Sequence, residues 1–242
     1  MISVIIPTLN EAANLPGLLR GLSAHKQDVE IIVVDGGSDD ATMDIAHQFG
    51  ARVIETRPGR GHQLRAGADG ATGEILWFLH ADSKVGPGSL DAISQMMGAH
   101  PALIGGNFRL QFDGNDEFSE WLNAFYARIR ARGFYYGDSG VFVRRQVYQE
   151  LGGIRPLALM EDYDFNRRLE KAGSTGIIDD PCLTTSSRRF KGRHKWNIIS
   201  EWVLIHALFY LRVPSPILAK IYNAQRHRRT AYRATPSFSD QS

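Results

Sequence analysis

The stretch VEIIVVDGGSDD, residues 29–40, decides the fold class. Its apolar run is nearly continuous, which is typical of a parallel strand covered on both faces. Asp35 and two glycines follow directly, and they indicate a tight turn in which the backbone can approach a ligand. A helix is expected next, extending to Phe49 with Ser38 or Asp39 as its N-cap. The segment is therefore a strand–turn–helix unit of an α/β protein.

The flanking sequence repeats this alternation. Apolar runs and apolar residues at helical spacing predict strands at 3–7, 51–55 and 75–79 and helices at 14–24 and 61–71. This order predicts a doubly wound sheet that binds ligands at the carboxyl ends of its strands. The second half is less regular. Its expected helices are 89–98, 116–130, 161–172 and 196–211, and its expected strands are 105–112 and 140–143.

The simplest organisation is a single domain, because the sequence contains neither a low-complexity linker nor an internal repeat. We predict this domain at residues 1–225, followed by a basic, flexible tail at 226–242. Within the domain we expect three parts, at about 1–100, at about 101–195 and at 196–225, and the last of them is helical.

The composition is that of an ordinary globular protein. Of the 242 residues, 43% are hydrophobic and 22% are charged. The single cysteine, Cys182, excludes an internal disulfide. The N-terminus lacks the pattern of a signal peptide, and no stretch reaches the roughly 20 apolar residues of a membrane span. We therefore expect a cytoplasmic protein.

The C-terminal part is strongly basic, with 11 Lys/Arg and two acidic residues over 188–242. Such a segment suits phosphate groups or an anionic membrane surface, and a solvated tail is the alternative. The arginines expected to meet an acceptor or phosphate group are Arg188, Arg189 and Arg193. Residues 196–229 are candidates for peripheral contact with the inner face of a membrane, while burial or a homodimer would also explain the apolar helix at 197–211. Nucleic acid is not an expected partner, since the net charge is only +2 and no binding motif occurs.

Two carboxylates follow buried strands and are candidates for ligand binding. Asp35 ends one strand, and Asp82 follows the strand at 75–79, which the simplest strand order places beside it. Asp35 could hold a ribose or base, or could merely cap the next helix. His80 precedes Asp82 by two residues, so both side chains would point to one side of an extended chain. Oxygen and imidazole ligands together favour Mn²⁺ over Mg²⁺, and local hydrogen bonding is the alternative role of His80.

A cluster of acids opens the helix expected at 161–172. Glu161, Asp162 and Asp164 all lie in its first turn. Acids at this place complement the helix dipole, so the cluster could be structural. Three acids in four residues exceed what capping needs, and one of them is therefore a candidate general base. Spacing does not choose among the three.

Taken together, these motifs resemble the inverting family 2 glycosyltransferases of the GT-A fold. The matching blocks are PTLNE (7–11), VVDGGSDD (33–40), GRGHQLRAGADGATGEILWFLHADS (59–83), GDSGVFVRR (137–145) and MEDYDFNRRL (160–169). They span about the first 170 residues in the family's order, and the ordered set is far more specific than any single block. HADS, GGNFRL, GDSGVFVRR and TSSRRF are similar to a bacterial subgroup of radical-SAM/selenodomain-associated family 2 transferases. The resemblance implies an α/β fold with a Rossmann-like mixed sheet flanked by helices. It also implies a nucleotide-binding half at about 1–100 and an acceptor and catalytic half at about 101–195.

The resemblance also implies site residues. For binding of the nucleotide-sugar donor they are Pro7, Thr8, Asn10, Glu11, Asp35, Gly37, Ser38, Arg60, Gln63, Ala81 and Asp82. Asp162 matches the catalytic base, with Glu161 beside it, and Asp138 lies where the acceptor or sugar approaches. Asp82 matches the last acid of the family's Asp-x-Asp motif, which holds a divalent cation. His80 stands where the family usually has the first acid of that motif, which leaves the metal site open to question.

The resemblance implies transfer of a sugar from a nucleotide-diphosphate sugar, with UDP the commonest donor nucleotide, to an acceptor hydroxyl. A single displacement would invert the anomeric carbon, assisted by Mn²⁺ rather than Mg²⁺. One alternative is a nucleotide-sugar-binding protein with little catalysis, for which the Glu161–Asp162 pair would have no use. Another is a nucleotidyltransferase, which should carry a glycine-rich basic loop after its first strand, where TLNEAANL stands.

Overall fold

The computed structural model describes residues 1–23, 29–187 and 194–234, and it divides into two compact units. Unit 1 comprises Met1–Pro156 and Glu161–Lys191, and unit 2 comprises Leu157–Met160 and Gly192–Ser242. This division differs from the single domain expected from the sequence. Its physical basis is the pairing of the two C-terminal helices with each other.

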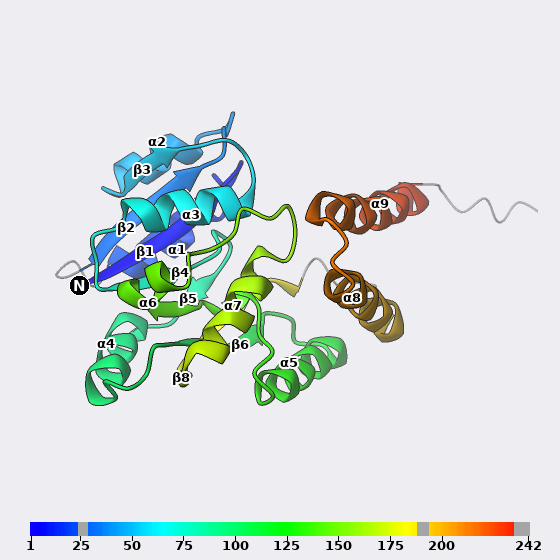
Figure 1. Ribbon diagram of the computed structural model, residues 1–242. Coiled ribbons are helices and arrows are strands. Elements are labelled where there is room, and N and C mark those ends of the chain that lie inside the picture. The colour runs from blue at the N-terminus through cyan, green and yellow to red at the C-terminus, as the bar shows by residue number, and fades with distance from the viewer. Residues whose placement is uncertain (24–28, 188–193, 235–242) are drawn as a thin grey trace, which may run out of the picture. The chain divides into compact units, whose positions relative to one another are not determined.

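Unit 1 is built on an eight-stranded sheet with the order β3-β2-β1-β4-β7-β6-β8-β5 (Figure 1). The strands are β1 (Ile2–Thr8), β2 (Val29–Asp35), β3 (Arg52–Glu55), β4 (Ile75–Phe78), β5 (Lys84–Val85), β6 (Gly105–Phe112), β7 (Phe142–Arg144) and β8 (Thr175–Thr185). Strands β3, β2, β1 and β4 are parallel, and β7 is antiparallel to both β4 and β6. The predicted mixed α/β sheet is confirmed.

The strand expected next to β2 pairs with β1 instead. Thr8 of β1 is in register with Asp35 of β2, and Ile5 is in register with Phe78 of β4. The chain crosses to β2 and β3 on one side of β1 and then returns to its other side with β4. This reversal is the topological switch point at which α/β sheets bind ligands. The carboxyl ends of β1, β2 and β4 are thereby brought to one edge.

Helices surround the sheet of unit 1 (Figure 1). They are α1 (Leu15–Ser23), α2 (Thr42–Gln48), α3 (Arg60–Gly70), α4 (Ser89–Ala99), α5 (Glu117–Arg130), α6 (Arg145–Glu150) and α7 (Glu161–Ala172), together with the 3-10 turn η1 (Gly137–Ser139). Helix α2 begins later than predicted, with Ala41 rather than Ser38 or Asp39 at its N-cap. Both predicted caps are engaged instead in hydrogen bonds to Asn10.

The core of unit 1 forms where α3 packs on β1 and β2. Gly67 of α3 makes this packing close, because a Cβ there would lie 2.5 Å from Ile5 and 2.8 Å from Val34. On the other half of the sheet, the buried ring of Trp77 stacks on Phe108 at 5.3 Å between centroids. The close packing of α3 fixes where its N-terminus lies relative to the strand ends.

Unit 2 contains the helices α8 (Lys195–Tyr210) and α9 (Ser215–Ala234), which pack on each other. Helix α9 continues past residue 225, the predicted end of the folded domain. Several large apolar side chains of this unit are exposed, among them Trp196, Val203, Tyr210 and Leu211. Among the helices of the described chain, none combines the length and apolar character that crossing a membrane requires.

Candidate active site

The ends of β1 and β2 are tied together around the carboxylate of Asp35. This side chain is fully buried and accepts hydrogen bonds from the amides of Gly37 and Ser38, at 2.9 and 2.7 Å. The hydroxyls of Ser38 and Thr8 donate to its other oxygen, at 2.6 and 3.1 Å. Burial would raise the pKa of Asp35, but these four donors outweigh it and hold the pKa below the usual range. The carboxylate of Asp35 therefore holds the turn after β2 in place. Its predicted contact with a ribose or a nucleotide base stays a prediction.

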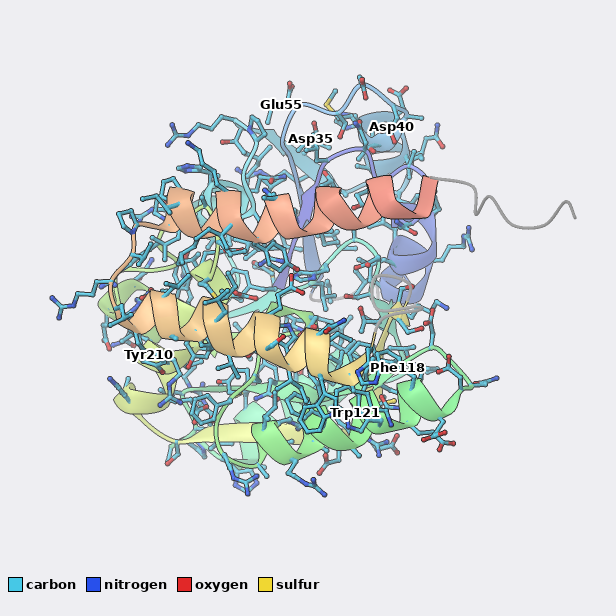
Figure 2. The ribbon with its side chains drawn as sticks, turned by 90° about the vertical axis from the view of Figure 1, so that its right-hand side faces the viewer. Asp35, Asp40, Glu55, Phe118, Trp121 and Tyr210 are labelled. Carbon is cyan, nitrogen blue, oxygen red and sulfur yellow. The ribbon has the colours of Figure 1, made fainter. Side chains whose placement is uncertain are left out.

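The loop after β1 is attached to the loop after β2 by a second set of hydrogen bonds. Asn10, at φ 57°, accepts from the amide of Asp39 at 3.0 Å and donates its own amide to Ser38 Oγ at 2.9 Å. The amide of Glu11 donates to Thr42 Oγ1 at 2.8 Å. Asp35 and Asp40 mark the two ends of this region in Figure 2. Hydrogen bonds therefore join the predicted nucleotide-binding residues of the two blocks.

Gln63 of α3 connects the same two strands from the other side. Its Nε2 donates to Thr8 O at 2.6 Å and to Val34 O at 2.9 Å, and the side chain is 4% exposed. Both side-chain N–H groups of Gln63 are therefore used within the protein. Its carbonyl oxygen is the group that could face the nucleotide-sugar donor, and this contact stays a prediction.

Arg60, the first residue of α3, meets the acids of α7. Its Nε donates to Glu161 Oε1, and its Nη2 lies 3.6 Å from Asp162 Oδ2. Burial alone would lower the pKa of Arg60, but Asp162, Glu161 and then Asp138 raise it. The guanidinium is therefore a fixed positive charge among three carboxylates, and it is still 38% exposed.

The carboxylate of Asp162 is held in a defined orientation. The amide of Gly137 donates to Oδ2 and the amide of Tyr163 donates to Oδ1, both at 2.8 Å. Burial would raise the pKa of Asp162, but Arg60, the Gly137 amide, His80 and the Tyr163 amide lower it below the usual range. Asp162 is therefore ionised at neutral pH, which is the protonation state that a general base requires.

Its neighbour Glu161 has a different environment. The side chain is 2% exposed, and burial raises its pKa, with Arg60 opposing this shift. Because its carboxylate is turned into the protein and bonded to Arg60, Glu161 is suited to positioning that arginine. The two adjacent acids thus have separate roles.

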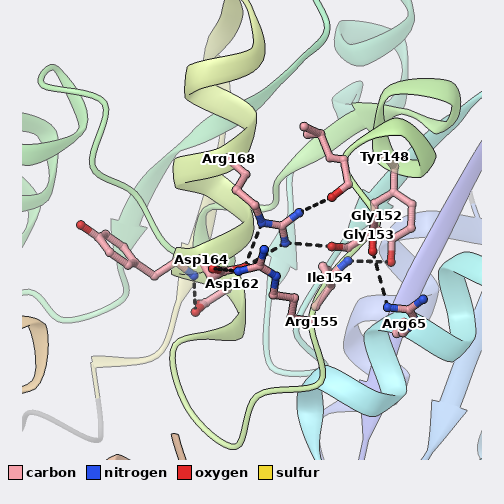
Figure 3. Close-up of polar contacts among 11 residues, drawn as sticks. Arg65, Tyr148, Gly152, Gly153, Ile154, Arg155, Asp162, Asp164 and Arg168 are labelled. Atoms are coloured by element: carbon pink, nitrogen blue, oxygen red, sulfur yellow. Dashed lines mark hydrogen bonds and ion pairs between the residues drawn. The ribbon is translucent and has the colours of Figure 1, made fainter. Parts of the chain in front are cut away.

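Asp164, the third acid of the cluster, is committed to structure (Figure 3). Its Oδ2 lies 2.9 Å from Nη2 of Arg168, and its Oδ1 lies 3.1 Å from Nη1 of Arg155. Arg168 also donates to the carbonyls of Leu151 and Gly153, at 2.6 and 2.8 Å. Asp164 therefore holds the segment before α7 in place, which argues against Asp164 as the general base.

His80 lies close to Asp162. A Cβ on Gly137 would lie 3.1 Å from His80 Nε2 and also 3.1 Å from Asp162 Oδ2, so both groups converge on this glycine. No cluster of three acidic, histidine or cysteine side chains suited to a metal occurs in the described residues. Asp82, half-buried after β4, fits a cation whose remaining ligands come from substrate phosphates, as is usual for Mg²⁺. Binding of a metal by His80 stays a prediction.

The sequence matches a known family over residues 3–173, described as glycosyl transferase family 2. The chain belongs to this family. A relative described as "PGL/p-HBAD biosynthesis glycosyltransferase" from Mycobacterium bovis is 33% identical over 197 residues, covering 76% of this chain and 72% of the relative. The 4,4'-diaponeurosporenoate glycosyltransferase of Staphylococcus haemolyticus is 39% identical over 103 residues, covering 39% of this chain and 28% of the relative. The protein is therefore a glycosyltransferase.

Solved structures of GT-A transferases share its fold. Mannosyltransferase PcManGT from Pyrobaculum calidifontis, in complex with GDP-Man and Mn²⁺, matches with a TM-score of 0.62 and 22% identity, covering 93% of this chain and 68% of that chain. Staphylococcus aureus TarS in complex with UDP-GlcNAc matches with a TM-score of 0.61 and 17% identity, covering 80% of this chain and 60% of that chain. These likenesses show that this family 2 glycosyltransferase has the GT-A fold.

Sequence reasoning about this family 2 glycosyltransferase missed several contacts. No role was predicted for Gly137, Asp40 or Thr42. Yet Thr42 and Asp40 tie the loop after β1 to the loop after β2. The short polar run around Asp40 predicts only a turn. For Gly137, the available signal was a glycine placed before an acid in GDSG. The predicted phosphate contacts Arg188, Arg189 and Arg193 lie outside the described residues. Pro7, Gly37 and Ala81 lie in or beside the ends of β1, β2 and β4, as predicted.

Proposed function

We propose that this glycosyltransferase moves a sugar from a nucleotide-diphosphate sugar to an acceptor hydroxyl by a single inverting displacement. The observation that carries this proposal is the ionised, oriented carboxylate of Asp162 at the switch point of the sheet. Asp162 takes the proton of the acceptor hydroxyl as its oxygen bonds to the anomeric carbon. The bond from that carbon to the diphosphate oxygen breaks, and the nucleoside diphosphate leaves on the opposite face.

Arg60 is suited to the charge that develops on the leaving diphosphate. Its guanidinium is permanently charged and partly exposed, and Glu161 restrains it from the buried side. Pro7, Thr8, Asn10, Glu11 and the β2 turn would receive the nucleoside. UDP is the proposed donor nucleotide. Solved structures with the same fold hold UDP-GlcNAc and GDP-Man, so GDP is the second donor nucleotide to test.

A divalent cation is part of this proposal. Asp82 would hold it together with the donor's phosphates, and bound Mn²⁺ would neutralise diphosphate charge. The Mn²⁺ complex of the mannosyltransferase from P. calidifontis supports this choice of metal. The proximity of His80 to Asp162 favours a role beside the base over a second metal ligand.

The proposal is tested by incubating the full chain with UDP- and GDP-sugars and Mn²⁺ and measuring release of the nucleoside diphosphate. Asp162→Asn should keep donor binding and lower turnover by about 10²–10⁴-fold, the usual contribution of a general base. Asp69→Asn is the matched control, because this acid is 63% exposed on α3, where it pairs with Arg65. Unchanged turnover in Asp162→Asn would exclude this residue as the base. Donor binding without any turnover would favour the binding-protein alternative.

We also propose that unit 2 contacts an anionic membrane surface. Trp196 is 71% exposed and Leu211 is 74% exposed, and the basic residues Arg212 and Lys220 lie nearby in the sequence. Apolar and aromatic side chains with adjacent positive charge are typical of helices that lie at a lipid interface. The full chain should co-sediment with phosphatidylglycerol vesicles more than with phosphatidylcholine vesicles. A homodimer that forms without any vesicle binding would refute this contact.

The matched variants use exposed apolar residues from the two units. Trp196→Ser should weaken vesicle binding, whereas Ile177→Ser should not, because Ile177 is 43% exposed on β8 of unit 1. Equal weakening by both substitutions would indicate nonspecific adsorption.

A further inference from the structure

Helix α7 carries the proposed base in its first turn and binds the segment before η1 with its second turn. The amide of Gly137, which opens η1, lies 2.8 Å from Asp162 Oδ2. Asn166 follows Asp162 by four residues, so the two side chains lie on the same face of α7. Asn166 is 2% exposed, and its Nδ2 donates to the backbone carbonyl of Tyr135 at 3.0 Å. The bonded carbonyl is two residues before Gly137 in the chain.

Two further residues of α7 hold the segment that leads into η1. Arg167 Nη1 donates to Gly133 O at 3.0 Å, and its guanidinium carbon lies 4.7 Å from the centre of the Phe134 ring. The hydroxyl of Tyr135 donates to Glu170 Oε1 at 2.8 Å. Burial and the charge of Glu170 raise the pKa of Tyr135, so this hydroxyl stays protonated and remains a donor. The segment is therefore bonded to the same helix that carries the base.

Asn166 bonds to the backbone at a point from which the Gly137 amide can be controlled. Only Tyr136 separates the bonded carbonyl from Gly137, and the ring of Tyr136 stacks on Tyr163 of α7 at 5.9 Å between centroids. A short peptide restrained at a carbonyl and at the next ring has little freedom to rotate its following amide. A hydrogen bond weakens steeply as its angle departs from linearity. Loss of the Asn166 bond would therefore weaken the contact that orients Asp162.

We propose that Asn166 is a positioning residue for the general base. Its side-chain amide holds the Tyr135 carbonyl and thereby keeps the Gly137 amide directed at Asp162. The inference rests on the proposed function, because it takes Asp162 to be the base. Asn166 itself contacts neither substrate and acts through the backbone of residues 135–137. The effect on rate is large because misplacing a reacting group by about 1 Å can cost about 10²-fold.

The test compares turnover and donor binding in the full chain. Asn166→Leu removes the N–H donor and keeps a side chain of similar shape. With the nucleotide sugar that the wild type uses, kcat should fall by about 10–100-fold. The Kd of that donor, measured by calorimetry, should stay within about twofold, because the nucleotide surface lies at the ends of β1 and β2. A general loss of structure would instead weaken donor binding together with kcat.

Asn123→Leu is the matched control. Asn123 is half-buried on α5, and its Oδ1 accepts from the amide of Phe112 at 2.8 Å. The substitution therefore removes a comparable bond between a side chain and the backbone, away from the segment that leads into η1. It should leave kcat unchanged.

A double-mutant cycle with Asp162→Asn separates positioning of the base from a general structural role. If Asn166 acts through the base, Asn166→Leu should not lower the residual turnover of Asp162→Asn any further. A general structural role would lower that residual turnover by the same factor as in the wild type. Residual turnover is measured as release of the nucleoside diphosphate.

Tyr135→Phe is the second variant if Asn166→Leu fails to fold. It removes only the hydroxyl that binds Glu170, and it should lower kcat several-fold without weakening donor binding. Wild-type kcat in the folded variant would overturn the proposal, as would an equal loss of kcat in the Asp162→Asn background. Wild-type turnover in Asp162→Asn alone would instead overturn the proposed function, so the two failures are distinguishable.

Discussion

Replacing Gln63 by methionine should loosen the strand ends on which the donor site is built. Gln63 donates two hydrogen bonds from Nε2, to Thr8 O at 2.6 Å and to Val34 O at 2.9 Å. The residue is 4% exposed, so water cannot readily replace the lost donors. Methionine has a similar length and fills the same space, and it therefore isolates the loss of the two N–H groups.

The magnitude follows from the partners that remain. Each lost bond costs about 1 kcal/mol, and an acceptor left wholly unmet costs about 1–3 kcal/mol. Thr8 O still accepts from the Gly36 amide at 2.9 Å, and Val34 O retains a longer contact of 3.4 Å with the Thr8 hydroxyl. Because both acceptors keep another partner, we expect a cost of about 1 kcal/mol for each lost bond. The free energy of unfolding should therefore fall by about 2 kcal/mol in total.

Urea unfolding of the full chain, followed by circular dichroism, measures this change. Gln48→Met is the control, because Gln48 is exposed on α2 and its substitution should stay within about 0.5 kcal/mol. UDP should also bind more weakly to Gln63→Met, since Thr8 and the β2 turn form the donor surface. A loss below about 0.5 kcal/mol for Gln63→Met, equal to the control, would refute the role of these two hydrogen bonds.

Three further predictions concern the reaction itself. Arg60→Gln should move the acidic limb of the pH–kcat/KM profile to higher pH, because Arg60 holds the pKa of Asp162 down while burial raises it; an unmoved limb would contradict this coupling. Gly137→Ala should lower kcat more than donor affinity, since its Cβ would lie 3.1 Å from both Asp162 Oδ2 and His80 Nε2; an unaltered kcat in a folded variant would contradict it. Treatment with EDTA should weaken binding of the nucleotide sugar, as measured by calorimetry, and added Mn²⁺ should restore it; equal affinity before and after chelation would refute the metal assignment.

Local patterns were sufficient for the family and for most elements of the first half of the chain, whereas β8, the short strand β5 and the helix α6 were not predicted, and α9 was expected only as part of a helical region. Strands such as VEIIVVD and helices such as residues 161–172 are set by apolar runs and spacing, which involve neighbours in the chain. The strand-end position of Asp35 likewise followed from sequence, because the acid adjoins the strand that delivers it. The glycosyltransferase assignment rested on ordered motifs, not on any contact.

Only the tertiary structure separated the three acids of α7 by role. Asp164 is paired with Arg155 and Arg168, and Glu161 is buried against Arg60. Asp162 is held by two backbone amides and lies 3.6 Å from Arg60. Arg60 lies 101 residues from Glu161 in the chain, so their contact depends on how α3 packs on the sheet.

The sequence by itself therefore determined the α/β class, the family and the segments that reach the site. The structure decided which side chains meet there, including His80 beside Asp162 at Gly137. The physical reason is that secondary structure follows from residues a few positions apart. Protonation and hydrogen bonding in a site depend instead on burial and charge contributed by residues distant in sequence.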